Sequence, residues 1–235
     1  MIVTKYYENG NIYQYLDRNN GILSWINIID ILRGIAEGLE EIHAEGKVHK
    51  NLHGGNLLVD KKFYIGTRIA DVGLYGPCEN KSSNQIYGVL PYIAPEVLRG
   101  ESYSTASDIY SFGIIMNTLA TGKKPWYNRA HDVSLAKDIC NGERLENPEG
   151  TPKFYAELMR QCWDNESENR PNASYLNKKL GEWIILICNN PTPSEILDEY
   201  SVAEEKRRKM TNTEKYAHPK IHPEAYYISR PLYNI

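Results

Sequence analysis

The sequence predicts a mainly α-helical fold with a short N-terminal strand and one small β-hairpin. Apolar residues recur at helical spacing in several segments, whereas strand-like stretches are few and short. Of the 235 residues, 41% are hydrophobic and 24% are charged, which is ordinary for a globular protein that buries a sizeable core. The length fits one large domain or two small ones.

The N-terminal part is expected to hold a short strand and two helices. Residues 2–7 predict the strand, which ends at the turn signal of residues 8–11, and a short helix follows over residues 13–16. Ser24 is a favourable N-cap for a longer helix that Gly46 ends. Behind Ser24, apolar residues at spacings of three and four form one stripe: Ile28, Leu32, Ile35, Leu39 and Ile42.

A hairpin, an irregular segment and a buried helix come next. The polar turn at residues 60–62 precedes residues 64–70, which are expected to pair back as a short strand. Residues 71–95 are rich in Gly, Pro, Asn and Ser and show no period, which is typical of a functional or disordered loop. Residues 108–119 are apolar nearly all round and predict a helix at the centre of the fold.

Weaker helical patterns occupy the C-terminal part. They predict three helices, over residues 133–141, 154–163 and 173–187. After a proline-containing break, residues 194–210 predict a last helix, whose acidic start and basic end suit the helix dipole. We expect its basic run, residues 206–209, to be a solvated face, and residues 211–235 to be an irregular tail.

Charge, hydropathy and cysteine spacing exclude several classes of protein. The 27 basic and 30 acidic residues nearly balance, which argues against nucleic acid or a membrane surface as the partner. The longest apolar run, residues 183–188, is too short to span a bilayer, and the N-terminus does not read as a signal peptide. The four cysteines are widely separated, so no zinc knuckle or disulfide framework is indicated and a cytoplasmic location is expected.

Four sequence pieces occur in a fixed order. They are residues 49–56 (HKNLHGGN), residues 71–73 (DVG), residues 94–96 (APE), and Asp108 with Asn169-Arg170-Pro171 downstream. Each piece is weak alone, but together they resemble the protein kinase family, in versions like the fungal tyrosine-kinase-like group. The resemblance covers residues 1–187 and implies the hinge and helical C-lobe of that fold. Residues 188–235 would then form a separate C-terminal helix and tail.

The resemblance implies a magnesium and ATP site. Asn56 and Asp71 stand at the positions of the two metal ligands, and an amide oxygen and a carboxylate are ligands that Mg²⁺ accepts. The alternative is that Asn56 is an Asx-turn residue and Asp71 a solvated turn aspartate.

Asn51 departs from the family pattern at a position that matters for chemistry. The family has an aspartate there, which orients the substrate hydroxyl and accepts its proton. An amide has nearly the same shape and still accepts a hydrogen bond, but it cannot take the proton at neutral pH. General-base catalysis contributes about 10²–10⁴ in rate. Lys50 likewise replaces an arginine and lacks its bidentate fork.

The nucleotide site also departs from the pattern. The family's N-lobe carries a glycine-rich loop and a strand lysine, and this sequence contains no G-x-G-x-x-G. By resemblance Thr4 is the gatekeeper, Lys5 to Tyr7 form the hinge, and Leu58 lies under the adenine ring. We expect an absent N-lobe and weak or no nucleotide binding by this chain alone.

The remaining matched residues are expected to be structural. Asp108 would hold the backbone of the 49–56 loop, Glu96 and Arg170 would form a buried ion pair, and His49 would be a packed core histidine. Three hydroxyls lie in the irregular segment and are either phosphorylation sites or solvated loop residues: Ser82, Ser83 and Tyr87.

Three functional hypotheses follow from these residues. The first is a catalytically inactive, kinase-like module that docks other proteins, with neither nucleic acid nor membrane as a partner. The alternative is part of an active Ser/Thr or Tyr kinase whose N-lobe lies upstream. A third is that the isolated product has no function, because an uncovered apolar floor would promote aggregation.

Overall fold

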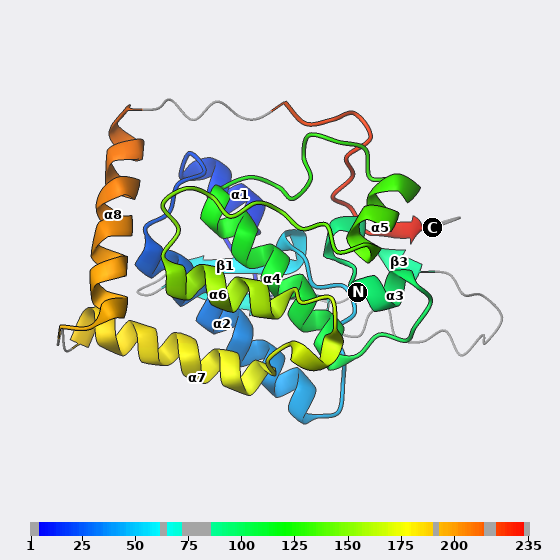
Figure 1. Ribbon diagram of the computed structural model, residues 1–235, viewed down its shortest axis with the longest axis horizontal. Coiled ribbons are helices and arrows are strands. Elements are labelled where there is room, and N and C mark those ends of the chain that lie inside the picture. Colours follow the sequence, from blue (N-terminus) through cyan, green and yellow to red (C-terminus); the bar gives the residue numbers. More distant parts are fainter. Residues whose placement is uncertain (1–4, 62–64, 72–85, 190–192, 214–219, 233–235) are drawn as a thin grey trace.

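Figure 1 shows the computed structural model, which describes residues 5–61, 65–71, 86–189, 193–213 and 220–232. The helices are α1 (Ile12–Arg18), α2 (Trp25–Ala44), α3 (Pro95–Leu98), α4 (Thr105–Thr121), α5 (Val133–Cys140), α6 (Lys153–Cys162), α7 (Ala173–Ile184) and α8 (Glu195–Thr213). A π-helical turn over Ile185–Asn189 continues α7, and 3₁₀ turns lie at Gly54–Asn56, Leu90–Tyr92 and Ser167–Asn169. The strands are β1 (Leu57–Lys61), β2 (Ile65–Ile69), β3 (Ile86–Gly88) and β4 (Arg230–Leu232).

Helix α2 confirms the long helix predicted from the apolar stripe. The Ser24 side chain accepts a hydrogen bond from the backbone N–H of Asn27, as an N-cap does. The stripe is buried except for the half-buried Ile42, and α2 packs against both α7 and β2. Gly34 permits this close approach, since a Cβ atom there would lie 3.2 Å from the backbone nitrogen of Thr67.

Helix α4 lies at the centre of the fold, as its apolar composition predicts. Ser104 and Ser107 form a reciprocal capping box at its start, and Gly122 ends it in the left-handed conformation with φ of 69°. Nearly all of its side chains are buried, and α6 and α2 pack against it (Figure 1). The start of α4 carries Asp108, so this buried helix fixes one part of the candidate site.

The four strands form two antiparallel pairs. β1 pairs with β2, with Leu57 opposite Ile69, which confirms the predicted hairpin. β3 pairs with β4 across 144 residues of sequence, so the irregular tail that the sequence predicts is wrong for Arg230–Leu232. The predicted strand at residues 2–7 is absent over Lys5–Tyr7, and its first residues lie outside the described part of the chain.

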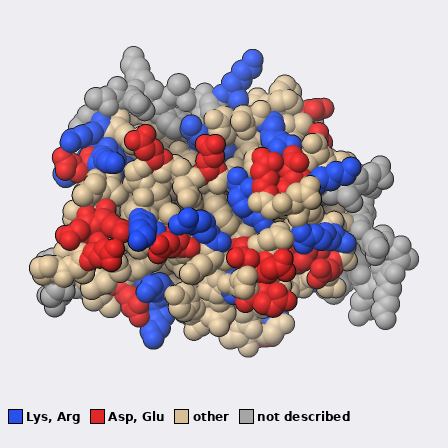
Figure 2. Space-filling view, in the orientation of Figure 1, with Lys and Arg blue, Asp and Glu red and all other residues tan. Residues whose placement is uncertain are grey.

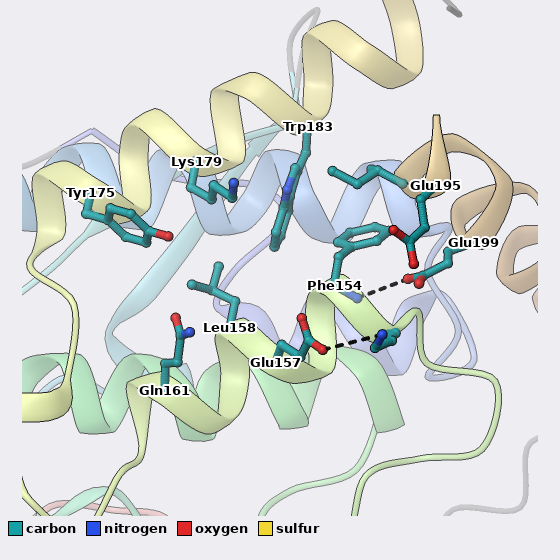
Figure 3. A pocket seen from close by; sticks show the side chains of 11 residues that line it. Phe154, Glu157, Leu158, Gln161, Tyr175, Lys179, Trp183, Glu195 and Glu199 are labelled. Atoms are coloured by element: carbon teal, nitrogen blue, oxygen red, sulfur yellow. Dashed lines mark hydrogen bonds and ion pairs between the residues drawn. The ribbon is translucent and has the colours of Figure 1, made fainter. Parts of the chain in front are cut away.

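Helix α8 stands across the ends of other helices (Figure 1). Glu204 accepts a hydrogen bond from the backbone N–H of Trp25 at the start of α2, at 2.8 Å. Glu199 accepts one from Phe154 at the start of α6, at 3.0 Å, and Figure 3 shows this contact beside a cavity of about 330 Å³ between α6, α7 and α8. Carboxylates at helix N-termini stabilise the exposed N–H groups and the dipole.

Arg207 corrects the expectation of a solvated basic run on this helix. Its guanidinium donates to the carbonyls of Ala120 at 3.0 Å and Leu119 at 3.3 Å, at the end of α4, and also to Leu23. It stacks 4.6 Å from the Trp25 ring centroid, and burial lowers its pKa to about 10. Thus α8 places carboxylates at the starts of α2 and α6 and a guanidinium at the end of α4. Each charge is favourable at the helix end that it contacts.

Candidate functional site

The 49–56 loop is held from behind by a single carboxylate. Asp108 is 1% exposed and accepts hydrogen bonds from the backbone N–H groups of His49 at 2.8 Å and Lys50 at 2.9 Å. The ring Nε2 of His43, from α2, lies 2.9 Å from the same carboxylate. Lys50 has a φ of 69°, a left-handed conformation that costs a non-glycine residue energy unless its surroundings fix it. The Asp108 contacts supply that constraint.

His49 is packed beneath the loop. Its exposed fraction is 3%, its Nε2 lies 3.0 Å from the carbonyl oxygen of Ala70, and its Nδ1 accepts from the backbone N–H of Asn51 at 3.3 Å. The ring therefore joins the loop to the segment that precedes Asp71. The structure places His49 as a core residue rather than at the open surface.

Asn56 and Asp71 lie at the same end of the β1–β2 hairpin. The carbonyl of Asn56 accepts a hydrogen bond from the backbone N–H of Ala70 at 2.8 Å, next to Asp71. The Asn56 side chain donates from Nδ2 to the carbonyl of Asn51 at 3.0 Å. That bond orients the amide, and its oxygen accepts no hydrogen bond from the residues that the structure describes. Asp71 has a φ of 61° and is half-buried.

Asn51 faces a residue of the C-terminal tail, far from it in the sequence. The hydroxyl of Ser229, in the C-terminal tail, donates to Asn51 Oδ1 at 2.9 Å. His53 Nδ1 accepts from the backbone N–H of Gly55 at 3.1 Å, so its ring proton is assigned to Nε2, which lies 3.1 Å from Ser229 Oγ. Burial, and next the neighbouring His49, lower the pKa of His53 to about 4, which keeps this ring neutral.

The amide nitrogen of Asn51 differs from its oxygen. Asn51 is 5% exposed, and its Nδ2 has no hydrogen-bond partner among the residues the structure describes. A buried donor without a partner costs about 1–3 kcal/mol. The Asn51 side chain therefore accepts a hydrogen bond through Oδ1 but donates none through Nδ2 to the described residues.

The two glycines of the loop lie in close contact with neighbouring rings. A Cβ atom at Gly54 would lie 2.8 Å from the Tyr13 ring, and one at Gly55 would lie 2.8 Å from the His53 ring. The glycines let these rings approach the loop, and the rings in turn confine it.

Three of the four residues predicted to bind nucleotide line one cavity. Lys5, Tyr7 and Leu58 border a pocket of about 300 Å³ beside α1. Lys5 forms an ion pair with Asp60, which raises the pKa of the lysine. Thr4 lies outside the described residues, as do Ser82 and Ser83.

Tyr87 is placed in β3 instead of in a solvated loop. Its hydroxyl donates to the carbonyl of Ser229 at 3.2 Å, and its own carbonyl accepts from the Tyr103 hydroxyl at 3.1 Å. The hydroxyl predicted as a phosphorylation site is thus engaged with the tail.

Glu96 and Arg170 form the pair that the resemblance implies. Arg170 Nη1 binds Glu96 Oε1 at 2.7 Å and Nη2 binds Oε2 at 2.8 Å, a bidentate geometry. The arginine side chain is fully buried and that of Glu96 is 10% exposed. Arg170 also donates to the carbonyls of Ala106 and Asp164, so its donors are well used.

Ser229 was not predicted to reach the site, and His53 was predicted only as a member of the 49–56 motif. Their contacts join residues 176 and 178 positions apart, and no local pattern predicts such a pairing. The only signal is the run Tyr226-Tyr227-Ile228, whose aromatic and β-branched residues favour an extended strand in a tail otherwise called irregular.

Comparison with known proteins identifies the class. The family model described as protein tyrosine and serine/threonine kinase matches residues 1–180. The chain is 30% identical to ephrin type-A receptor 8 of Rattus norvegicus over 182 residues, and 33% identical to ephrin type-A receptor 6 of the same species over 191 residues. It is 30% identical to a probable serine/threonine-protein kinase of Dictyostelium discoideum over 182 residues.

The chain belongs to the protein tyrosine and serine/threonine kinase family. The matched part covers 75%, 77% and 77% of this chain in those three comparisons, but only 48%, 18% and 11% of the relatives. The chain therefore spans less than half the length of each of these proteins. The family generally uses ATP and Mg²⁺.

Proposed function

We propose that this chain is a catalytically inactive, kinase-like docking module of the tyrosine-kinase-like group. Residues 1–187 would form its hinge and C-lobe, and residues 188–235 its C-terminal helix and tail. The observation that carries the proposal is Asn51, an amide at the position of the proton acceptor, whose oxygen binds the hydroxyl of Ser229. Orientation of a hydroxyl survives this substitution, but proton acceptance does not.

The donor set beside Asn51 fits a magnesium ion. Asp71 offers a carboxylate and Asn56 the oxygen of an oriented amide, and Mg²⁺ needs only one or two protein oxygens when phosphate and water supply the rest. Asn56 and Asp71 would hold the ion, which would offset phosphate charge. Lys5, Tyr7 and Leu58 would contact adenine. Binding should be weak, since the sequence has no glycine-rich phosphate loop.

A phosphate-transfer assay on the full chain tests this proposal. With radiolabelled ATP, Mg²⁺ and generic protein substrates, we expect no more incorporation from the wild type than from Asp71→Ala. Incorporation by the wild type that Asp71→Ala abolishes would contradict the proposal, because a retained metal site would then be supporting catalysis.

Part of an active kinase is the second candidate function, and the intact support of the 49–56 loop favours it. Asp108, His49 and the Asn56–Ala70 contact hold the 49–56 loop and the segment before Asp71 together, an arrangement that phosphate transfer would also require. If this candidate holds, a longer protein that includes the upstream N-lobe should transfer phosphate, and Asn51→Asp in it should raise the rate by about 10²–10⁴, the usual contribution of a general base. Failure of that longer protein to transfer phosphate even with Asn51→Asp would eliminate this candidate.

We propose protein partners and a cytoplasmic location, with neither nucleic acid nor a membrane as a partner. Figure 2 shows acidic and basic side chains interspersed over one face of the molecule, without a field of a single sign. Within the described residues, no helix has the length and apolar composition needed to cross a bilayer. Cys140, Cys162 and Cys188 are free thiols, in keeping with a reducing compartment.

A further inference from the structure

The C-terminal segment 220–232, here called the tail strap, ends beside β3 and α5 (Figure 1), and its Ser229 contacts Asn51 and His53 of the 49–56 loop. Its last residues form β4 and pair with β3, with Gly88 opposite Arg230 and Ile86 opposite Leu232. Among the described residues β3 has no other strand partner. Main-chain pairing of this kind is how an extended peptide adds to the edge of a sheet.

Ser229, just before β4, is fixed on three sides. Its hydroxyl donates to Asn51 and lies against His53 Nε2, while its carbonyl accepts from the Tyr87 hydroxyl. The strap thus presents one small hydroxyl residue to the amide at the base position. A larger side chain at 229 would have to displace either Asn51 or His53.

His131 holds the middle of the strap. Its backbone N–H donates to the carbonyl of Glu224 at 2.9 Å, and its ring Nδ1 accepts from the backbone N–H of Tyr226 at 3.1 Å. Its carbonyl accepts from the guanidinium of Arg230 at 3.0 Å. His131 is 3% exposed, so these contacts are shielded from solvent.

Tyr227 anchors the strap in an aromatic pocket. Its hydroxyl donates to the carbonyl of Pro125 at 2.8 Å, and its ring lies 5.0 Å from the His131 ring and 6.1 Å from the Tyr13 ring. The ammonium of Lys124 lies 5.1 Å above the ring centroid of Tyr227. By contrast the neighbouring Ile228 is 81% exposed and makes no such contact.

We propose that the tail strap is an intramolecular ligand that closes a peptide groove, and that partner proteins dock by displacing it. The proposed groove is the surface that the strap contacts, made of β3, Asn51, His53 and His131. The partner segment it fits is extended, with an aromatic residue for the Tyr227 pocket and, two positions later, a serine or threonine opposite Asn51. The strap contact stands by itself, whereas the partner's part in it rests on the docking role proposed above.

Hydrogen–deuterium exchange on the full chain tests the strap. Ser229→Arg should place a long charged side chain between Asn51 and His53 and release the segment. We expect faster exchange in residues 222–232 and in Ile86–Gly88, with little change in α4. Ile228→Ala is the matched control, because it alters the same segment at its exposed position, and it should leave exchange unchanged. Unchanged exchange in Ser229→Arg would overturn the proposal.

Binding of a labelled peptide with the sequence of residues 220–232 tests the groove. A tethered ligand competes at a high effective concentration, so the peptide should bind Ser229→Arg at least ~10-fold more tightly than the wild type. The same peptide carrying Ser229→Ala should bind about 10-fold more weakly, because the acceptor of Asn51 and the donor of His53 lose their partner. Equal affinity for wild type and Ser229→Arg would overturn the groove.

A milder variant guards against misfolding. Tyr227→Phe removes only the hydroxyl that binds Pro125 and should raise peptide affinity in the same direction by a smaller factor. Neither readout depends on phosphate transfer, so an active enzyme would overturn the inactive role and leave the strap standing. A dimer that Ser229→Arg dissociates would show that the strap comes from a second copy and would overturn the intramolecular form.

Discussion

The 49–56 loop has two sides, and they differ in how their polar groups are satisfied. Behind the loop, Asp108 is a buried carboxylate that receives two backbone N–H groups and faces His43 Nε2. In front, Asn51 is a buried amide with one hydroxyl partner and an unpartnered Nδ2 among the described residues. The difference teaches that the loop's shape depends on the carboxylate behind it and tolerates a neutral residue in front.

The same contrast extends through the rest of the domain. The back of the site is charge-paired, since Arg170 and Glu96 bind each other with both arms and are largely buried. The front is neutral and is covered by the hydroxyl of Ser229 and the uncharged ring of His53. Charge is thus paired at Asp108 and between Glu96 and Arg170, whereas the position of Asn51 is neutral.

Breaking the ion pair behind the site should have the largest effect. Arg170→Leu leaves the Glu96 carboxylate buried without its partner, which typically costs about 3–5 kcal/mol. Urea unfolding of the full chain, followed by circular dichroism, measures the change.

A surface pair serves as the control for Arg170→Leu. Arg129 binds Asp138 at 2.7 Å with both side chains about a third exposed, so Arg129→Gln should cost less than ~1 kcal/mol. Equal effects of the two substitutions would mean that the back of the site does not owe its stability to paired charge.

An aspartate-to-asparagine change behind the loop should have the next largest effect. Asp108→Asn puts an N–H₂ group where one carboxylate oxygen now accepts hydrogen bonds, so donors face donors. The expected loss of unfolding free energy is about 2–4 kcal/mol, since hydrogen bonds to a charged group and buried backbone donors are both lost.

Asp132→Asn is the matched control for this change. Asp132 caps α5 by accepting from the backbone N–H of Leu135 at 3.1 Å, and asparagine caps about as well as aspartate. If both substitutions left the unfolding midpoint unchanged in urea, the contrast between the two sides of the loop would not hold.

Local patterns predicted the helices well, because each depends on a stripe that one element carries by itself. The stripe from Ile28 to Ile42 and the cap at Ser24 place α2, and the apolar segment 108–119 places α4 with its start three residues earlier. The order of the four motif pieces predicted the family, which the comparisons confirm.

The pairings across long distances could not be read from the sequence. Arg207 points inward because it donates to two carbonyls at the end of α4. The sequence of residues 206–209 contains no pattern that predicts this contact with α4. Likewise β4 is only three residues long and contains Pro231, so its own sequence does not predict a strand. It is a strand only because it pairs with β3. The motif residues of the candidate site, Asn51 included, were therefore predictable from the sequence, but the tail residues that cover Asn51 were not.

The smallest effect should come from pH, through the residue that holds the tail strap. Burial lowers the pKa of His131, with Arg230 adding to the shift and the carbonyls of Tyr226 and Trp126 opposing it. The unfolded chain therefore binds a proton more readily than the folded one. Stability from His131 is complete above its ordinary pKa of 6.5 and declines as the pH falls below that value.

Comparison of the wild type with His131→Asn isolates this contribution, since asparagine can still accept the Tyr226 N–H but does not titrate. Exchange in residues 222–232 should quicken between pH 7.5 and 5.5, after correction for intrinsic rates, and should do so less in His131→Asn. His53 has the same sign of dependence and remains in both proteins, so only the difference between them reports on His131. An identical pH response in the two proteins would mean that protonation of His131 does not weaken the strap. The contacts of Tyr227 and the pairing with β3 would then hold the strap in place.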